Sequence, residues 1–364
     1  MSAAPRVNRI LMFHVKQINQ YIDVSRETLR DKDGVKGRSM TRKFLRMLAL
    51  TVMTAAIAAA NLALPTHAQE PVRVIFPFTA GGSGDALARH IAEGLRMALD
   101  QPVIVENRTG AQGRLGVQAV KAAAPDGKTL LLTPVAPMSV YAHVYKALLY
   151  DPVADFEPVS QVATFDFAIA VGPQVPAASL KELVAWVKAN PAQGNYGTPA
   201  AGTLPHFFAV SFAKTAGLDL RHVGYRGSAA ALTDLVGGQI SIVVTTTSDV
   251  LEQHKAGRIR VLATSDKARS PFLPDIPTFK QAGYDIEGSG WYGVYVPAKT
   301  PPDVVAQLNK AIVAAVQSAP VKEKLLAFGL VPSGTTATEL RKIQAADSEL
   351  WAPAVRASGF TPEQ

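Results

Sequence analysis

The chain has 364 residues, of which 48% are hydrophobic, so it is long enough for two domains with a large buried core. It contains no cysteine, which excludes a disulfide framework, a cysteine-ligated metal centre and a thiol nucleophile. Residues 1–68 hold 11 of the 37 Lys/Arg and 4 of the 29 Asp/Glu, which leaves 26 basic and 25 acidic residues in 69–364. Because this larger part is nearly neutral, a nucleic-acid partner is not indicated.

Residues 40–68 have the pattern of a secretory signal peptide. Arg42, Lys43 and Arg46 precede an apolar run at 48–64, and Thr66-His67-Ala68 offers small residues at the positions that signal peptidase recognises. We expect cleavage after Ala68. A transmembrane anchor is the alternative, but the run has only 17 residues and is rich in alanine.

Residues 1–39 are polar and mixed in charge, with no clear amphipathic period. A signal peptide normally begins at the N-terminus. Our hypothesis is therefore that translation starts at Met40 and that 1–39 is an extension of the gene model; the alternative is that 1–39 is a disordered segment. Peptides from 1–39 in mass spectra of the precursor would refute the translation start.

From residue 72 onward, short apolar strands alternate with helical patterns. Strands are predicted at 72–78, 103–106 and 129–133, with one helix at 85–99 and another that follows the loop 110–113 and ends near 123. This β-α-β-α-β order predicts an α/β domain with a largely parallel sheet.

The alternation restarts near residue 160, with strands predicted at 168–171, 220–223, 240–245, 260–264 and 291–296. Capping boxes at Ser179/Glu182 and Thr336/Glu339 mark the starts of two helices, and 302–318 is amphipathic. Two α/β halves predict two lobes, and we expect the chain to cross between them near 168–172 and 291–297. Ligands of such folds bind beyond the carboxyl ends of strands, at helix N-termini.

Three glycine-containing loops connect an apolar segment to a predicted helix. They are FTAGGSGD at 78–85, YGTPAAGTLPH at 196–206 and YRGSA at 225–229. Glycine lets the backbone approach a ligand closely, and free N–H groups at a helix start favour an anion. A phosphate-binding loop is not indicated, because no GK[ST] follows and Leu87 interrupts GxGxxG. Each loop alone could be a tight turn, with Asp85 as a helix N-cap; three together predict a cleft lined with hydrogen-bond donors.

Signals for catalysis are weak. The histidines of 69–364, at positions 90, 143, 206, 222 and 254, are not spaced as HExxH or HxxxH, and GxSxG is absent. We interpret His206 as a structural capping residue. Arg89 and Arg226 could each pair with a carboxylate, although a solvated or salt-bridged arginine is the more common case. We therefore expect no enzyme, no cofactor and no metal.

A dozen short motifs follow one another through 70–360. They include Phe76-Pro77-Phe78, Gln101-Pro102-Val103, Tyr150-Asp151-Pro152, the loop at 196–206, Leu273-Pro274-Asp275 and Trp291-Tyr292-Gly293. In this order they resemble the Bug-type solute receptors of tripartite tricarboxylate transporters. The resemblance implies an α/β fold of the two-lobed periplasmic binding-protein type II class, each lobe a mixed, largely parallel sheet flanked by helices. Lobe 1 would comprise 69–170 and 294–364, and lobe 2 would comprise 171–293.

The resemblance also implies a function. The protein would be a periplasmic, monomeric receptor that captures a small carboxylate in the interlobe cleft, closes about hinges near 170 and 293, and docks on the membrane subunits of a tripartite tricarboxylate-type transporter. Two alternatives stay open, namely a ligand-presenting component of a signalling system and an exported hydrolase. A hydrolase would change its ligand, whereas a receptor would return it unchanged.

By position, the resemblance implies a set of ligand-binding residues: Phe78, Ala80, Gly81, Asp85, Val135, Ala136, Thr198, Gly202, Thr203, Gly227, Ser228, Ala229 and Thr245. The bends at 80–84 and 198–203 are expected to face each other across the cleft. Where relatives often carry Gly and Asn in the second loop, this chain has Ala200 and Ala201. Where many carry acids, it has Ser241 and Thr245. A less acidic, more apolar pocket favours a carboxylate with an apolar or aromatic body over an amino acid.

Overall fold

The computed structural model describes residues 70–361. Residues 1–39, the predicted signal peptide and its expected cleavage site after Ala68 lie outside the described residues. None of the described helices combines the length and the apolar character that crossing a bilayer requires. The described strands are joined by hydrogen bonds into one ten-stranded sheet, in the order β2-β1-β3-β9-β4-β7-β5-β6, with β8 and β10 also paired to β4.

The strands predicted in the first part of the chain form a parallel group at one end of the sheet. They are β1 (Val72–Phe76), β2 (Val103–Asn107) and β3 (Thr129–Pro134), with β1 in the middle. Antiparallel pairing continues from β3 to β9 (Ser289–Pro297), and β10 (Val331–Pro332) lies beside β4. The predicted β-α-β-α-β unit with a largely parallel sheet is therefore confirmed.

The other end of the sheet contains the later strands. They are β5 (Asn195–Thr198), β6 (Arg221–Gly224), β7 (Ile242–Thr246) and β8 (Arg260–Thr264). β5 runs parallel to both of its neighbours, β6 and β7. The strands predicted at 220–223, 240–245 and 260–264 are within two residues of these bounds, whereas β5 falls at the start of a segment that was predicted as a loop.

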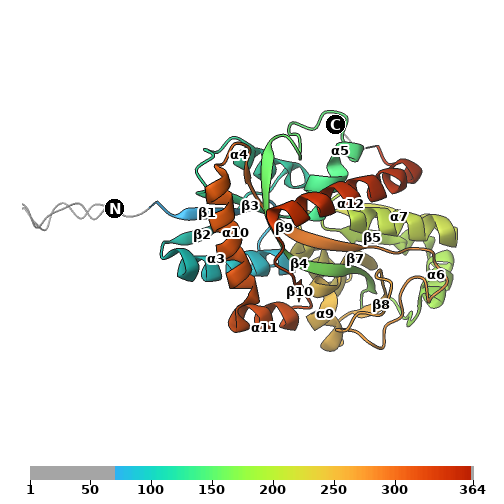
Figure 1. The fold of residues 1–364 in the computed structure, drawn as a ribbon. Coiled ribbons are helices and arrows are strands. Elements are labelled where there is room, and N and C mark those ends of the chain that lie inside the picture. Colours follow the sequence, from blue (N-terminus) through green and yellow to red (C-terminus); the bar gives the residue numbers. More distant parts are fainter. Residues whose placement is uncertain (1–69, 362–364) are drawn as a thin grey trace, which may run out of the picture. The chain divides into compact units, whose positions relative to one another are not determined.

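The strand β4 (Phe156–Val171) is much longer than the strand predicted at 168–171. Its first part, up to Asp166, pairs with β9, and its last part, from Phe167, pairs with β7 and β8. The prediction was too short because almost every residue of β4 is buried on both faces, so the sequence lacks the alternation of a half-buried strand. β4 and β9 thus carry the chain between the two halves of the sheet (Figure 1), near the predicted crossings.

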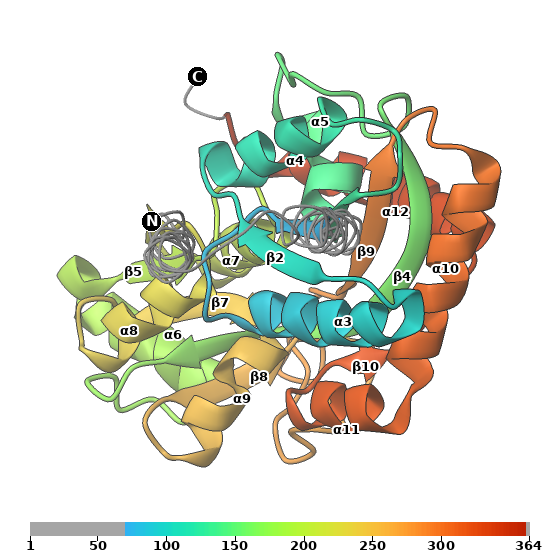
Figure 2. The same ribbon diagram turned by 90° about the vertical axis from the view of Figure 1, so that its left-hand side faces the viewer.

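Helices flank both halves (Figures 1 and 2). Beside the parallel strands lie α3 (Ser83–Leu99), η1 (Ala111–Gly113), α4 (Arg114–Lys121), η2 (Ala136–Val140), α5 (Tyr141–Val144), α10 (Pro302–Gln317) and α11 (Ala319–Ala327). The later half carries α6 (Leu180–Ala189), η3 (Pro191–Gln193), α7 (Leu204–Ala216), α8 (Ser228–Val236) and α9 (Thr247–Lys255). α3 and α10 approach so closely that a Cβ at Gly94 would lie 2.5 Å from Cβ of Ala315.

The C-terminal helix α12 (Ala337–Ser358) contacts both halves of the fold. Trp291 of β9 donates from Nε1 to Oδ2 of Asp347 at 2.5 Å. On the other side, the ring of Trp351 packs edge-to-face on Phe208 of α7, with centroids 5.7 Å apart. The predicted first lobe includes 294–364, but the helix α12 in this segment also packs on the second half of the fold.

The two predicted capping boxes differ in the structure. At α12, Thr336 Oγ1 accepts from the Glu339 amide at 3.2 Å and the Glu339 carboxylate accepts from the Thr336 amide at 2.8 Å, so the box is complete. At α6, Ser179 Oγ accepts from the Glu182 amide, but the Glu182 carboxylate accepts from Ala178 instead of Ser179. That box is incomplete, because the carboxylate reaches one residue further back. The helix predicted at 85–99 begins two residues earlier, at Ser83.

Thr336→Ala should lower the free energy of unfolding by about 1 kcal/mol, because it removes the side-chain oxygen that caps the first turn of α12. Urea unfolding followed by circular dichroism measures this loss. Thr336→Ser keeps the hydroxyl and should stay close to the parent protein. Equal losses in the two variants would show that the cap does not stabilise α12.

Candidate ligand-binding site

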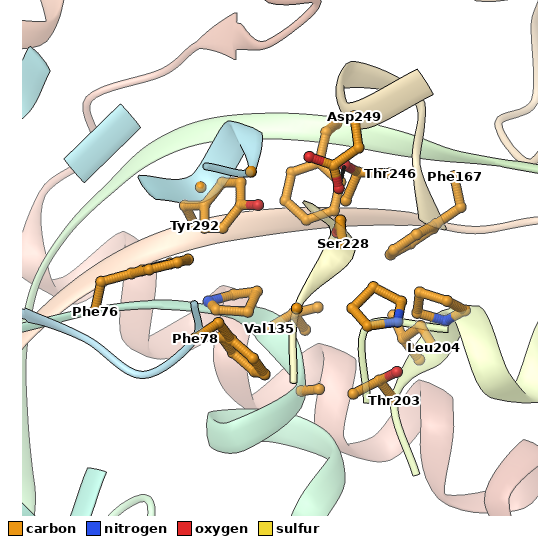
Figure 3. A pocket seen from close by; sticks show the side chains of 18 of the residues that line it. Phe76, Phe78, Val135, Phe167, Thr203, Leu204, Ser228, Thr246, Asp249 and Tyr292 are labelled. Atoms are coloured by element: carbon orange, nitrogen blue, oxygen red, sulfur yellow. Dashed lines mark hydrogen bonds between the residues drawn. The ribbon is translucent and has the colours of Figure 1, made fainter. Parts of the chain in front are cut away.

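A cavity of about 600 Å³, including the space at its open mouth, lies at the carboxyl ends of strands from both halves of the sheet. Its apolar wall comprises Phe76, Phe78, Pro134, Val135, Ala136, Phe165, Phe167, Pro199, Leu204 and Pro205. Its polar groups come from Thr79, Thr203, Ser228, Thr246, Asp249 and Tyr292. Figure 3 shows ten of these side chains with labels, and they converge from strands, loops and the first turns of helices. The predicted position, beyond strand ends and at helix starts, matches this cavity.

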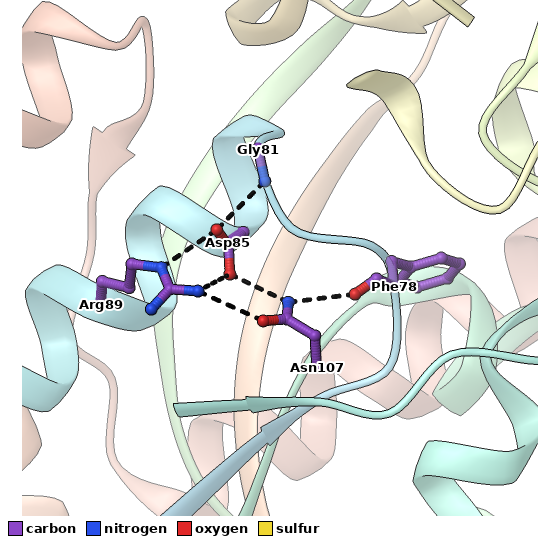
Figure 4. A network of polar contacts seen from close by, with 5 residues as sticks. All are labelled: Phe78, Gly81, Asp85, Arg89 and Asn107. Carbon is purple, nitrogen blue, oxygen red and sulfur yellow. Dashed lines mark hydrogen bonds and ion pairs between the residues drawn. The ribbon is translucent and has the colours of Figure 1, made fainter. Parts of the chain in front are cut away.

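The first glycine loop is fixed by Asp85, which does not line the cavity, through the polar contacts drawn in Figure 4. The Asp85 carboxylate accepts from the Gly81 amide at 3.1 Å, from Asn107 Nδ2 at 2.9 Å and from the Arg89 guanidinium at 3.1 Å. Asn107 Nδ2 also donates to the Phe78 carbonyl. Burial alone would raise the pKa of Asp85, but the hydrogen bonds from Arg89 and Asn107 outweigh it and lower the pKa. Asp85 is therefore a positioning residue for this loop, and the N-cap of α3 is Gly82.

The direct neighbours of the first loop are the third loop and the start of α9. The Thr79 amide donates to the Arg226 carbonyl at 3.1 Å. A Cβ at Gly81 would touch Ala229 at 3.6 Å, and a Cβ at Gly82 would lie 3.5 Å from Oδ1 of Asp249. The bends at 80–84 and 198–203 both border the cavity, but 226–229 lies closest to the first bend.

Asp249 places a carboxylate in this cavity, and the sequence analysis did not identify it. Its Oδ1 accepts from the Ser83 amide at 2.8 Å, and its Oδ2 accepts from the hydroxyls of Thr245 and Thr246 at 2.9 and 2.8 Å. The signal that could have found it is Thr246-x-x-Asp249, a helix-start pattern directly after a strand. The cavity is therefore more acidic than Ser241 and Thr245 led us to predict.

Two helix starts at the cavity have amide groups with no partner inside the described chain. The amides of Leu204 and His206 in α7 and of Ser228 and Ala229 in α8 donate to no other described group, as expected for the first turn of a helix. These N–H groups and the two helix dipoles favour an anion. No Lys, Arg or His belongs to the described residues that line the cavity.

Comparisons with known proteins agree with this architecture. Residues 87–360 match the model of the TctC family, described as the tripartite tricarboxylate transporter family receptor. The chain belongs to this receptor family. Protein BugT of Bordetella pertussis is 34% identical over 323 residues, which cover 88% of this chain and 98% of BugT. Since its relatives are periplasmic solute-binding proteins, we assign the receptor to solute binding and not to catalysis.

Solved structures of relatives share the two-lobed periplasmic binding-protein fold of the receptor. The periplasmic binding protein BugD is 30% identical, with a TM-score of 0.77, and the match covers 81% of this chain and 99% of BugD. The Rhodopseudomonas palustris protein Rpa4515, solved with adipate, is 29% identical, with a TM-score of 0.78 and the same coverage. MatC of that organism, solved with bound malate, is 26% identical, with a TM-score of 0.75, and the match covers 80% of this chain and all of MatC.

The structure brings together part of the residue set that the resemblance implied. Those that line the receptor's cavity are Phe78, Val135, Ala136, Thr203, Gly227 and Ser228. Those that lie near it in the sequence of its loops and strands without lining it are Ala80, Gly81, Asp85, Thr198, Gly202, Ala229 and Thr245. Sequence reasoning missed several lining residues, chiefly Phe76, Phe165, Phe167, Asp249 and Tyr292. Of the two candidate arginines, Arg89 is paired with Asp85 and Arg226 is exposed.

A stacked pair of histidines supports the second loop of the receptor. The rings of His206 and His222 lie 4.1 Å apart. Nδ1 of His206 accepts from the Gly202 amide at 3.2 Å, so it caps the turn as predicted. Nε2 of His222 lies 2.7 Å from the Thr198 hydroxyl. Burial lowers the pKa of His206 to about 3, with the neighbouring His222 adding to the effect, and burial lowers the pKa of His222 to about 4.

Proposed function

We propose that the receptor captures a small carboxylate in this cavity and presents it to the membrane subunits of a tripartite tricarboxylate-type transporter. The observation that carries the proposal is that the starts of α7 and α8 each contribute one cavity-lining residue, Leu204 and Ser228, whose amide has no partner within the described chain. The adipate and malate bound to two structural relatives support a carboxylate as the ligand. Export to the periplasm with cleavage near Ala68 is part of the same proposal.

Binding would depend on backbone amides and dipoles instead of a cationic side chain. Several N–H donors and two helix N-termini stabilise an anion in a site that is otherwise apolar, where hydrogen bonds to a charged group are strong. Phe76, Phe78 and Phe167 would then contact the carbon skeleton. A ligand that lacks a carboxylate would leave these helix starts unpaired, which would make its binding weak.

Closure would join the two predicted lobes, 69–170 with 294–364 and 171–293. Hydrogen bonds at the cavity already cross between them, among them the bond from the Thr79 amide to the Arg226 carbonyl and the bond from the Ser83 amide to Asp249. Opening would break both. We place the bending region where β4 changes partners, between Asp166 and Phe167, and at the start of β9. Closure about such a region buries the ligand and removes water from the amides.

Ser228→Pro should weaken carboxylate binding roughly 10- to 100-fold, because proline fits the first position of α8 but removes one N–H donor to a charged group. Titration calorimetry with a panel of small mono- and dicarboxylates measures the affinities. Ser228→Ala is the matched control, since it loses the hydroxyl and keeps the amide, and it should bind within a few-fold of the parent. Equal affinities for all three proteins would show that the α8 amide does not bind the ligand, and would contradict the proposal.

A further inference from the structure

We infer that Asp249 makes the receptor selective for monocarboxylates, with an apolar body and room for a hydroxyl at the far end, and makes it reject dicarboxylates. The inference rests on the proposed function, because it assumes that one ligand carboxylate binds at the starts of α7 and α8.

The number of anions that the cavity can hold depends on the helix starts around it. Four helices, α3, α7, α8 and α9, begin at the cavity. The amides at the starts of α7 and α8 are free within the described chain, but at α3 the Ser83 amide already donates to Asp249 at 2.8 Å. The receptor's own carboxylate therefore occupies the start of α3, and it also lies in the first turn of α9. The starts of α7 and α8, which the proposed function assigns together to one ligand carboxylate, form the open anion site. A dicarboxylate needs a second such site, and none is left.

The position of Asp249 relative to the α7 start decides which end of a ligand it meets. In Figure 3, Asp249 and Thr246 lie at one end of the cavity, and Thr203 and Leu204 of the α7 start lie at the other, with Ser228 between them. A ligand whose first carboxylate binds beside Leu204 would extend its other end toward Asp249. The described lining residues include no cationic side chain that would compensate a second negative charge there. Two like charges in an apolar site repel strongly.

The hydrogen bonds that Asp249 already accepts limit what it can still bind. Three protein donors, the Ser83 amide and the hydroxyls of Thr245 and Thr246, use three of the roughly four lone-pair directions of a carboxylate. One direction remains, which suits a single neutral donor such as a hydroxyl. Phe76, Phe165 and Phe167 line the space between the two ends. The far end of the ligand is therefore apolar or carries one hydroxyl.

The test uses three six-carbon probes that differ only at the far end, namely hexanoate, 6-hydroxyhexanoate and adipate. Calorimetry of the mature receptor should show both monocarboxylates binding at least tenfold more tightly than adipate. Asp249→Asn keeps the shape and removes the charge, so it should improve adipate binding at least tenfold and change hexanoate binding less than threefold. Glu252→Gln removes the same charge from an exposed position on α9 and should leave the preference unchanged.

The outcomes separate this inference from the proposed function. If adipate binds the unmodified receptor as tightly as hexanoate, the selectivity inference is wrong while carboxylate capture stands. If Asp249→Asn is folded and keeps the preference of the parent, Asp249 is not its cause and the inference also fails. If none of the three probes binds, carboxylate capture itself fails and this inference fails with it. The comparison within the unmodified receptor needs no variant, so it decides even if Asp249→Asn does not fold.

Discussion

Gly84→Leu should abolish carboxylate binding and lower the free energy of unfolding by about 3 kcal/mol. A Cβ at this position would lie 2.5 Å from Cζ of Phe76 and 2.8 Å from the Tyr292 hydroxyl. Both rings are buried walls of the cavity, so neither can move aside without disturbing the core. Overpacking of this kind commonly costs about 1–3 kcal/mol, and leucine adds three further carbons to the clash. Urea unfolding and calorimetry measure the two effects.

Gly82→Ala is the matched control in the same loop. Gly82 has φ −89°, which any residue can adopt, and its added Cβ would lie no closer than 3.5 Å to a neighbouring atom. We expect its stability to stay within about 0.5 kcal/mol of the parent. If the two variants unfold at the same urea concentration, the contact between a side chain at position 84 and Phe76 does not destabilise the folded state.

Acidification should destabilise the receptor through His206 and His222. Their folded pKa values, about 3 and about 4, lie below the ordinary value of 6.5, so the unfolded chain binds protons first as the pH falls. Their stabilising contribution is complete above pH 6.5 and is lost progressively between 6.5 and the folded pKa values. At about pH 4.5 the loss is on the order of 3 kcal/mol for His206 and less for His222, whose ring is partly exposed. Urea unfolding at a series of pH values gives the slope.

The double variant His206→Gln/His222→Gln cannot titrate in this range and should have a clearly shallower slope. Comparison with the parent is essential because Asp166 acts in the opposite direction. Burial raises its pKa to about 6, so its protonation stabilises the folded state as the pH falls. His143→Gln, at an exposed position, controls for the loss of an imidazole. Parallel slopes for the parent and the double variant would contradict the assignment.

Local sequence patterns predicted the parts of the fold that depend on local chemistry. The parallel β1, β2 and β3 follow from apolar runs separated by helical patterns, and the complete cap at Thr336 follows from a four-residue motif. The single strand β4 was not predictable in its full length, because its partners β9, β7 and β8 are far away in sequence and its burial hides any alternation.

The residues of the site were also predicted only in part. Thr203 and Ser228 were found because they mark helix starts in glycine-containing loops. Asp85 was expected at the ligand, but its partner Asn107 lies 22 residues away on β2, and no local pattern shows that pairing. Asp249 was missed for the converse reason. Its position just after a strand is typical of an ordinary acidic residue in the first turn of a helix. The Ser83 amide that donates to its carboxylate is 166 residues away, so only the folded chain brings the two together.

The long strand β4 also has a consequence for how the receptor can be divided. Because one strand supplies hydrogen-bonding partners to both halves of the sheet, the boundary between the lobes runs along a strand and not through a linker. A fragment that contained only one lobe would lack either β4 or the partners of β4, and it would expose a long apolar edge that invites aggregation. The two lobes should therefore fold and unfold together as one cooperative unit, even though they would move separately when a ligand binds.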